Sequence, residues 1–383
     1  MSETLRLGTR GSDLALRQAG AVKERLERRR RAVELVEVET TGDRVDDELI
    51  HRLGKTGAFV RDLDEQVLAG DVDAAVHSMK DVPTEMPDEM VVAGVPERGP
   101  ARDLLVTPAG ESLSALPDGA TVGTSSLRRR AQVLARRPDL VVRPLRGNVD
   151  TRVEKLLAPT LQREHERRLE AAGELDDPDG DADGDGAFAS GDGTADADSE
   201  DVTPEFERTV QEWFEGLAEI ERRALERSVD VEYDAIVLAE AGLERSGLLH
   251  HVPHERLPTA EFVPAPGQGA LAVTAADESV TATVQEMVDH PHTRVETTVE
   301  RTVLARLGGG CIAPVGIYAV LQGPVVRTTV RVLGREGETE VAETRELPVG
   351  EHADAARAFA ADLADRGAAD IIDRARKRAE EDA

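Results

Sequence analysis

The chain has 383 residues, and its 76 acidic residues against 47 lysines and arginines give a net charge of −29 at pH 7. This length is enough for two or three domains, each with its own core. The single cysteine excludes a disulfide framework and a zinc site built on several cysteines. The negative charge and the 2% content of aromatic residues argue against general nucleic-acid binding.

The acidic residues are spread along the whole chain. Such a surface repels itself at low salt and keeps a protein dissolved where salt screens the repulsion, a device of halophiles. We interpret the acidity as adaptation to salt, and a cationic ligand or a basic protein partner is the less favoured alternative. No charged-then-apolar leader opens the sequence and no apolar run has membrane-spanning length, so we expect a soluble cytoplasmic protein.

Strand and helix patterns alternate in the first hundred residues. We expect strands at 3–7, 33–38 and 72–76, with helices that run from Asp13 to about Leu26 and from Phe59 to Gly70. Strand, helix, strand, helix, strand at short spacing predicts a parallel α/β sheet.

The same alternation restarts after a stretch rich in proline and glycine at 95–100. The expected elements are strands at 104–106, 121–122, 140–142 and 233–238, and a helix at 127–137. The strand-to-helix turns at 8–12 and 123–126 occupy equivalent places in the two units. This equivalence indicates one architecture used twice.

Two further segments differ from these units. Residues from about 158 to 230 interrupt the second unit: 176–201 has the composition of a disordered loop, and apolar residues at helical spacing follow at 206–220. The last segment combines a helix that ends at the glycines from 308, alternating strands at 315–332 and a charged helix from 353. It predicts a small α+β domain.

The two equivalent turns are candidate anion sites. A strand-to-helix turn gathers free backbone N–H groups at the positive end of a helix dipole. Ser12 and Ser126, taken singly, are explained as well by helix N-capping. Arginines close to loops that follow strands favour the functional interpretation, and these are Arg10, Arg128, Arg129 and Arg146. We therefore expect a ligand with several carboxylates or phosphates.

Cys311 and Asp81 are the other candidates for chemistry. Cys311 follows three glycines that would present its thiol openly, and the alternative is a small buried side chain. Asp81 and Lys80 end an apolar strand. They are either a surface ion pair or the site of a partly buried carboxylate that can hold a developing cation. The adjacent His77 has the position of a structural histidine.

Five motifs in this order resemble the porphobilinogen deaminase (hydroxymethylbilane synthase) family. They are GTRGSDLA at 8–15, HSMKDVP at 77–83, GTSSLRR at 123–129, LRGNV at 145–149 and GGGCIAP at 308–314. The resemblance extends almost from end to end apart from the insert, and the acidity indicates a halophilic archaeon as the source.

The resemblance implies three domains, of which the first two are α/β domains with parallel-rich sheets, built like periplasmic binding proteins around a cleft. The expected boundaries are 1–97 with 268–287 for domain 1, 101–263 for domain 2 with the acidic insert at about 158–230, and 291–383 for the α+β domain 3. This third domain carries the cofactor cysteine.

The resemblance also implies a transferase of tetrapyrrole (haem and corrinoid) biosynthesis. Porphobilinogen units lose ammonia one at a time and are coupled head to tail onto a dipyrromethane cofactor, which a thioether joins to the cysteine that matches Cys311. After four additions, hydrolysis releases hydroxymethylbilane. Hand-over of this product to uroporphyrinogen III synthase, a monomeric state, and the absence of metal, nucleic-acid and membrane partners are further expectations.

Individual residues are assigned by the same resemblance. Asp81 matches the catalytic aspartate, which stabilises positive charge on pyrrole nitrogens and assists proton movement. Phe59 matches an aromatic residue of a mobile loop over the site. The matches to cofactor- and substrate-binding residues are Arg10, Ser12, Ser78, Lys80, Thr124, Ser126, Arg128, Arg129, Arg146, Arg152 and Arg245.

Two features depart from the family pattern. Thr56 stands where the family usually has a lysine, with Lys55 one place earlier, and the insert is not a usual family feature. The alternative is a binding function instead of an enzymatic one: an anion-binding protein of the same fold that forms no covalent adduct. A cysteine hydrolase would require a histidine base held by a third group, and no histidine of the sequence has motif support for that role.

Overall fold

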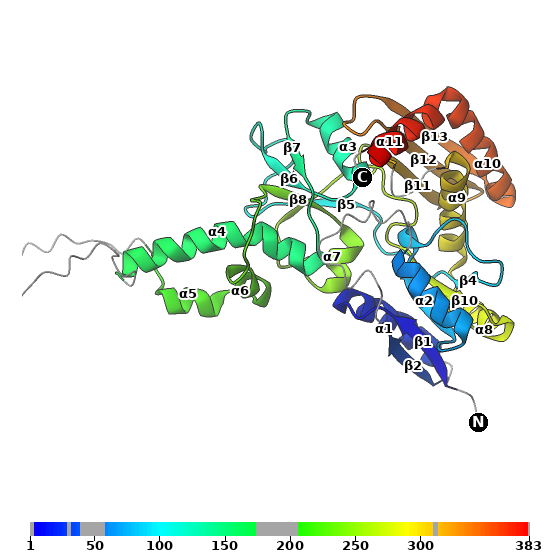
Figure 1. Ribbon diagram of the computed structural model, residues 1–383, viewed down its shortest axis with the longest axis horizontal. Coiled ribbons are helices and arrows are strands. Elements are labelled where there is room, and N and C mark those ends of the chain that lie inside the picture. Colours follow the sequence, from blue (N-terminus) through cyan, green and yellow to red (C-terminus); the bar gives the residue numbers. More distant parts are fainter. Residues whose placement is uncertain (1–3, 29–31, 39–57, 174–205, 309–312, 382–383) are drawn as a thin grey trace, which may run out of the picture. The chain divides into compact units, whose positions relative to one another are not determined.

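A computed structural model describes residues 4–28, 32–38, 58–173, 206–308 and 313–381 of the chain (Figure 1). The chain divides into two compact units, Met1–Arg152 with Tyr233–Ala383, and Val153–Glu232. The strands of the described residues form three sheets, and all three belong to the first unit.

The first sheet has the strand order β2-β1-β3-β10-β4. Its strands are β1 (Leu5–Thr9), β2 (Val33–Glu37), β3 (Ala74–Ser78), β4 (Val91–Gly94) and β10 (Leu271–Ala275). Strands β2, β1 and β3 are parallel, and β10 runs antiparallel between β3 and β4. Helices α1 (Asp13–Glu27) and α8 (Glu278–Val288) share one apolar cluster with the sheet, and α2 (Ala58–Ala69) packs in another. The central strands β1, β3 and β10 are therefore buried on both faces of the sheet, whereas the edge strands β2 and β4 are partly exposed.

The second sheet repeats this arrangement, with the strand order β7-β6-β8-β5-β9. Its strands are β5 (Asp103–Val106), β6 (Thr121–Gly123), β7 (Val141–Arg143), β8 (Ala235–Ala239) and β9 (His254–Arg256), and its helices are α3 (Leu127–Arg136) and α7 (Glu240–Ser246). Strands β7, β6 and β8 are parallel, and β5 is antiparallel to β8 and β9. The prediction of one parallel-rich α/β architecture used twice is confirmed.

The third sheet is antiparallel and has the order β11-β12-β13. The elements of this region are α9 (Pro291–Leu307), β11 (Val315–Gln322), β12 (Val325–Leu333), β13 (Glu340–Pro348), α10 (His352–Leu363) and α11 (Ala369–Glu381). Helices α9 and α10 pack together and against the sheet, around the fully buried Phe359 (Figure 1). Gly308, with φ +67°, caps α9 where the glycine run predicted its end. The charged C-terminal helix is interrupted at Gly367, where φ is +100°.

The second unit is helical in its described residues. Helix α4 (Val149–Ala172) begins in the first unit and continues into the second, which also contains α5 (Val210–Gly216) and α6 (Glu219–Leu225). The apolar spacing at 206–220 predicts one helix, but the extended backbone of Leu217, with ψ 142°, separates two. The guanidinium of Arg168 lies 4.2 and 5.1 Å from the ring centres of Phe206 and Trp213. The insert thus has cation–π contacts of its own.

Candidate functional site

The predicted residues of the first sheet lie at the carboxyl ends of its parallel strands. Arg10 and Ser12 follow β1, while Ser78 ends β3 and leads into a short 3-10 turn, η2 (Met79–Asp81). Strands β1 and β3 are neighbours that run in the same direction. Both loops therefore leave the same edge of the sheet, where α/β proteins bind ligands.

Asp81 lies at the end of η2 with its side chain 51% exposed. The Nζ of Lys80 is 3.6 Å from its Oδ1, an ion pair that contributes little between half-exposed groups. His77 is buried instead, and its Nε2 lies 3.1 Å from both Asp64 Oδ1 and Thr274 Oγ1. His77 thus has the structural position expected of it, whereas the carboxylate of Asp81 faces solvent.

The predicted residues of the second sheet occupy equivalent places. Thr124 and Ser126 follow β6, Arg146 follows β7, and Arg245 lies on α7 directly after β8. These three strands are parallel neighbours. One edge of this sheet therefore gathers the predicted anion-binding residues, as one edge of the first sheet does.

Both turn serines are helix caps. Ser12 Oγ accepts a hydrogen bond from the backbone N–H of Ala15, and Ser126 Oγ accepts one from that of Arg129, each at 3.4 Å. The capping explanation is therefore correct for both hydroxyls. The prediction that these two serines also bind anions is supported only by the position of their turns, each of which follows a parallel strand at one edge of its sheet.

Arg128 and Arg129 point into the interior and bind Asp103, the first residue of β5. Arg128 Nη1 lies 2.7 Å from Asp103 Oδ2, and Arg129 Nη2 lies 2.8 Å from Oδ1. Burial opposes the charge of Asp103, but the two guanidiniums outweigh it and lower the pKa of the carboxyl from 3.8 to about 2. Burial lowers the pKa of Arg128. Two cations against one anion leave this buried cluster with a surplus positive charge.

Gln268 extends this cluster toward the place where residues 98–101 cross residues 267–269, which we call the chain crossing. Its Nε2 donates to Asp103 Oδ1 at 2.8 Å and to the carbonyl of Ala101 at 2.7 Å, and its Oε1 accepts from Arg128 Nη2 at 3.2 Å. The next residue, Gly269, has φ +85°, and a Cβ there would lie 2.6 Å from the carbonyl oxygen of Gly99. Only glycine permits the two crossing segments to approach this closely.

A buried ion pair joins the same crossing to helix α9. Arg98 Nη1 lies 2.8 Å from Glu300 Oε1, and Glu300 also accepts hydrogen bonds from the backbone N–H groups of Gly267 at 2.6 Å and Ala319 at 2.8 Å. Burial raises the pKa of Glu300, and Arg98 opposes that rise. Sequence reasoning missed Asp103, and it missed this pair as well. The glycines that flank Gln268 are the sequence signal that could have pointed to this close approach.

Arg152 lies in the first turn of α4. Its Nε donates to the carbonyl of Gly147 at 2.8 Å, and no carboxylate of the described chain pairs with it. Burial, and to a lesser degree the charge of Arg129, lowers the pKa of its guanidinium to about 10. A bound anion would relieve both effects.

Arg245 is held by the crossing, because its Nη2 donates to the carbonyl of Gly269 at 2.6 Å. Burial lowers the pKa of this guanidinium as well. Its helix, α7, lies beside α1 of the first sheet (Figure 1). Cys311 and Thr56 fall outside the described residues, as does the side chain of Phe59.

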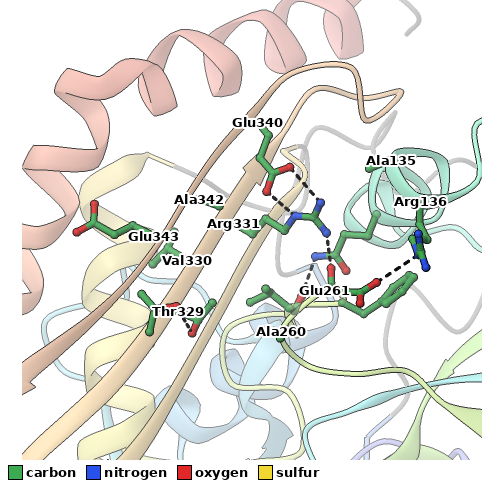
Figure 2. A pocket seen from close by; sticks show the side chains of 14 residues that line it. Ala135, Arg136, Ala260, Glu261, Thr329, Val330, Arg331, Glu340, Ala342 and Glu343 are labelled. Carbon is green, nitrogen blue, oxygen red and sulfur yellow. Dashed lines mark hydrogen bonds and ion pairs between the residues drawn. The ribbon is translucent and has the colours of Figure 1, made fainter.

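A pocket of about 370 Å³ lies between strands β12 and β13, helix α3 and residues 260–263 (Figure 2). Figure 2 shows Arg331 between Glu340 and Glu261: its Nε lies 2.9 Å from Glu340 Oε1, and its Nη1 donates to the carbonyl of Glu261. None of the predicted site residues lines this pocket. Its two arginines pair with acids, Arg136 with Glu261 and Arg331 with Glu340.

In the part of the chain that the structure describes, no group of three or more His, Cys, Asp or Glu side chains is arranged to hold a metal ion. No helix of that part combines the length and the apolar character needed to cross a membrane.

Comparison with known proteins gives matches along almost the whole chain. A family model described as "Porphobilinogen deaminase, dipyromethane cofactor binding domain" matches residues 5–163 and 215–283, and one described as "Porphobilinogen deaminase, C-terminal domain" matches residues 295–365. A "Probable porphobilinogen deaminase" of Halobacterium salinarum is 56% identical and covers 99% of this chain and 100% of its own. A "Porphobilinogen deaminase" of Rubrobacter xylanophilus is 37% identical and covers 97% of each chain, and one of Sulfurimonas denitrificans is 32% identical and covers 96% of each.

Similarity to solved structures is weaker. An ectoine binding protein, TeaA, has a TM-score of 0.30 at 10% identity and covers 74% of this chain and 75% of its own. The methionine binding protein MetQ has a TM-score of 0.29 at 14% identity and covers 74% of this chain and 87% of its own.

Proposed function

The chain belongs to the porphobilinogen deaminase family, and from this premise we propose that the arginines at its strand ends bind the carboxylates of porphobilinogen and of the growing product. The activity of the enzyme is the transferase reaction of the family. Four porphobilinogen units are condensed head to tail with loss of ammonia, and hydrolysis releases hydroxymethylbilane. The observation that carries the binding proposal is Arg152, whose guanidinium lacks a carboxylate among the described residues and has a pKa lowered to about 10.

The residues of the site fit the dipyrromethane cofactor. Each pyrrole unit brings two carboxylates. The cluster of Arg128, Arg129 and Asp103 has a surplus of positive charge, and the guanidinium of Arg152 adds another. When bound, the cofactor supplies the pyrrole carbon to which substrate units are joined. This fit concerns charge and donor type, the two properties that carboxylate recognition by arginine requires.

The arginines divide into two roles in this proposal. Most donors of Arg128 and Arg129 are occupied by Asp103, Gln268 and backbone carbonyls, so these two residues supply a positive field. Arg152 makes a direct contact to a carboxylate. The other proposed contacts are Arg10, Ser12, Ser78, Lys80, Thr124, Ser126, Arg146 and Arg245, and Phe59 belongs to the proposed loop over the site.

Asp81 is the proposed catalytic carboxylate. A porphobilinogen unit that loses ammonia becomes positively charged at its pyrrole ring, and a carboxylate beside the nitrogen stabilises that charge and accepts a proton. Two observations support Asp81: its half-exposed side chain and its position at the edge where β1 and β3 both end. The C–N bond at the aminomethyl carbon breaks and its electron pair leaves on nitrogen as ammonia. The same carbon then forms a C–C bond to the terminal pyrrole of the chain, which loses a proton from the carbon that is joined.

The proposed attachment residue is Cys311, and intact-protein mass spectrometry with peptide mapping tests it. Denatured wild-type protein should show a mass excess equal to two linked pyrrole units on the peptide that contains Cys311. The Cys311→Ala variant should fold, lack the excess and be inactive. An unmodified thiol in protein from a host that supplies porphobilinogen would favour the anion-binding alternative instead.

The division into three domains is part of the same proposal, with 1–97 and 268–287, 101–263 and 291–383 as boundaries. Three sheets with separate apolar clusters support it. We also propose a monomer in the cytoplasm that hands its product to uroporphyrinogen III synthase. Light scattering after size exclusion in high salt tests the monomer, and a mass of two chains would contradict it.

A further inference from the structure

Arg301, on helix α9, holds the segment that follows Asp81. Its Nη1 donates to the carbonyl of Val82 at 2.7 Å, and its Nη2 donates to the carbonyl of Pro83 at 2.6 Å. The two acceptors belong to consecutive residues, so the planar guanidinium binds the backbone at two adjacent carbonyls. No sequence motif marked this residue.

The guanidinium has no acidic partner among the residues that the structure describes. Burial lowers the pKa of Arg301 below its usual value. Hydrogen bonds from a charged donor are stronger than those between neutral groups, so the two carbonyls are the main compensation for its charge. The contact is therefore a specific attachment of α9 to this one loop.

The loop itself leaves Asp81 lightly restrained. Within the described chain, the ion pair of its carboxylate is the 3.6 Å contact with the half-exposed Lys80. The turn of η2 is closed by a single bond from the N–H of Val82 to the carbonyl of Met79, at 3.2 Å. The turn is anchored before Asp81 by the bond from the N–H of Met79 to the carbonyl of Ala270, at 3.0 Å, and after it by the two bonds from Arg301.

Helix α9 also leads to the cofactor attachment. It ends at Leu307 with the Gly308 cap, three residues before Cys311. The residue before Arg301 is Glu300, which holds Gly267 of the chain crossing. One helix thus contacts both the crossing and the loop that follows Asp81.

We propose that Arg301 is a positioning residue that holds the backbone next to Asp81 and thereby sets the direction of its carboxylate. The inference rests on the proposed catalytic role of Asp81 and deepens it. The competing explanation is that Arg301 merely attaches α9 to the rest of the fold. Arg294 offers a control for attachment, because it lies two turns earlier on α9 and donates to the carbonyls of Val92 at 2.9 Å and Ala93 at 3.1 Å. Unlike Arg301, it also pairs with an acid, Asp289, at 2.7 Å.

The test compares Arg301→Gln with Arg294→Gln in the full chain at high salt. We expect Arg301→Gln to lower kcat about tenfold or more with KM within about twofold, because misplacement of a reacting group acts on the chemical step. Hydrogen exchange should rise in the peptide 79–86 in Arg301→Gln and not in Arg294→Gln. Intact mass should show the cofactor in both variants. If Arg301→Gln does not fold, Arg301→Lys is judged by the same criteria.

A double-mutant cycle with Asp81→Asn separates positioning from attachment. If Arg301 acts through Asp81, adding Arg301→Gln to Asp81→Asn should lower kcat little further. Losses that multiply, or a kcat of Arg301→Gln within twofold of wild type, would overturn the inference. Normal turnover of Asp81→Asn alone would remove the catalytic role of Asp81, and hydrogen exchange would still decide whether Arg301 holds the loop.

Discussion

Asp103 and Arg129 form a two-pronged contact, in which Nε and Nη2 of the arginine lie 3.0 and 2.8 Å from the same carboxylate oxygen, Oδ1. The other oxygen, Oδ2, accepts from Arg128 Nη1 at 2.7 Å. Because both guanidiniums are buried, Asp103 is the charge that permits two adjacent arginines to share the first turn of α3.

The Asp103→Asn variant should therefore lose stability. Removing one partner of a buried ion pair leaves uncompensated charge and costs about 3–5 kcal/mol of unfolding free energy. Urea denaturation in high salt measures this loss. Asp139→Asn, which breaks the more exposed pair with Arg137, is the control and should change stability little. Equal effects of the two substitutions would contradict the assigned role of Asp103.

The same carboxylate predicts a pH dependence. The pKa of Asp103 is about 2 in the folded chain against its ordinary 3.8, so the unfolded chain binds the proton more readily. Its contribution, about 2 kcal/mol, is complete above pH 4 and is lost as pH falls from about 4 to about 2. The stability difference between wild type and Asp103→Asn should shrink over this window. A difference that stays constant with pH would show that the carboxylate is not stabilised by the arginines.

Arg152→Gln should raise KM for porphobilinogen about ten- to a hundredfold with a small effect on kcat, because a charged hydrogen bond to a bound carboxylate is lost. Steady-state kinetics at fixed salt measure it. Wild-type KM should also rise as pH passes about 10, where Arg152 loses its charge, and this part of the rise should be absent in the variant. Arg136→Gln, at a side chain 65% exposed, is the control. A KM change no larger than that of the control would exclude direct binding by Arg152.

Asp81→Asn should keep the cofactor and turn over about a hundredfold or more slowly, because general acid–base groups contribute at least this much. Activity assays combined with intact mass measure both properties. Lys80→Gln is the adjacent control for charge at the same loop and should change KM more than kcat. Near-normal turnover of Asp81→Asn would remove this residue from the chemistry.

Stability should increase strongly with salt. At a net charge of −29 the folded chain repels itself, and the screening length falls from about 10 Å at 0.1 M to about 3 Å at 1 M salt. The thermal midpoint should therefore rise between 0.1 and 1 M KCl. Glycerol at matched osmolality does not screen charge and should not reproduce this rise. Full stability and activity in dilute buffer would contradict the interpretation of the acidity.

Local sequence signals predicted the elements whose causes are local. Ser12 before Asp13 predicted the start of α1, and Gly308 predicted the end of α9, because a cap is made by residues within a few positions of the helix end. The apolar periodicity at 206–220 failed to show the break at Leu217, since that pattern continues across both short helices.

Long-range contacts explain what the sequence left undetermined. In the sequence, Asp103 resembles an ordinary charged residue at the end of a strand. The two arginines that bind it lie 25 and 26 residues further along the chain, so their pairing is not visible in the local pattern. Strand β10 is buried at all five positions, yet its place beside β3 depends on pairing across nearly 200 residues. The motifs identified the loops of the candidate site, but the occupation of Arg128 and Arg129 by Asp103 follows only from packing.

The position of β10 between β3 and β4 has a consequence for synthesis on the ribosome. The second sheet has all its strands once Arg256 has been made, but the first sheet lacks its antiparallel strand until Ala275 has been made. The sheet that begins first along the chain therefore cannot be complete until after the second sheet has all its strands. During that wait β3 and β4 lack the strand that joins them, and a chaperone that shields strand edges would protect them from aggregation.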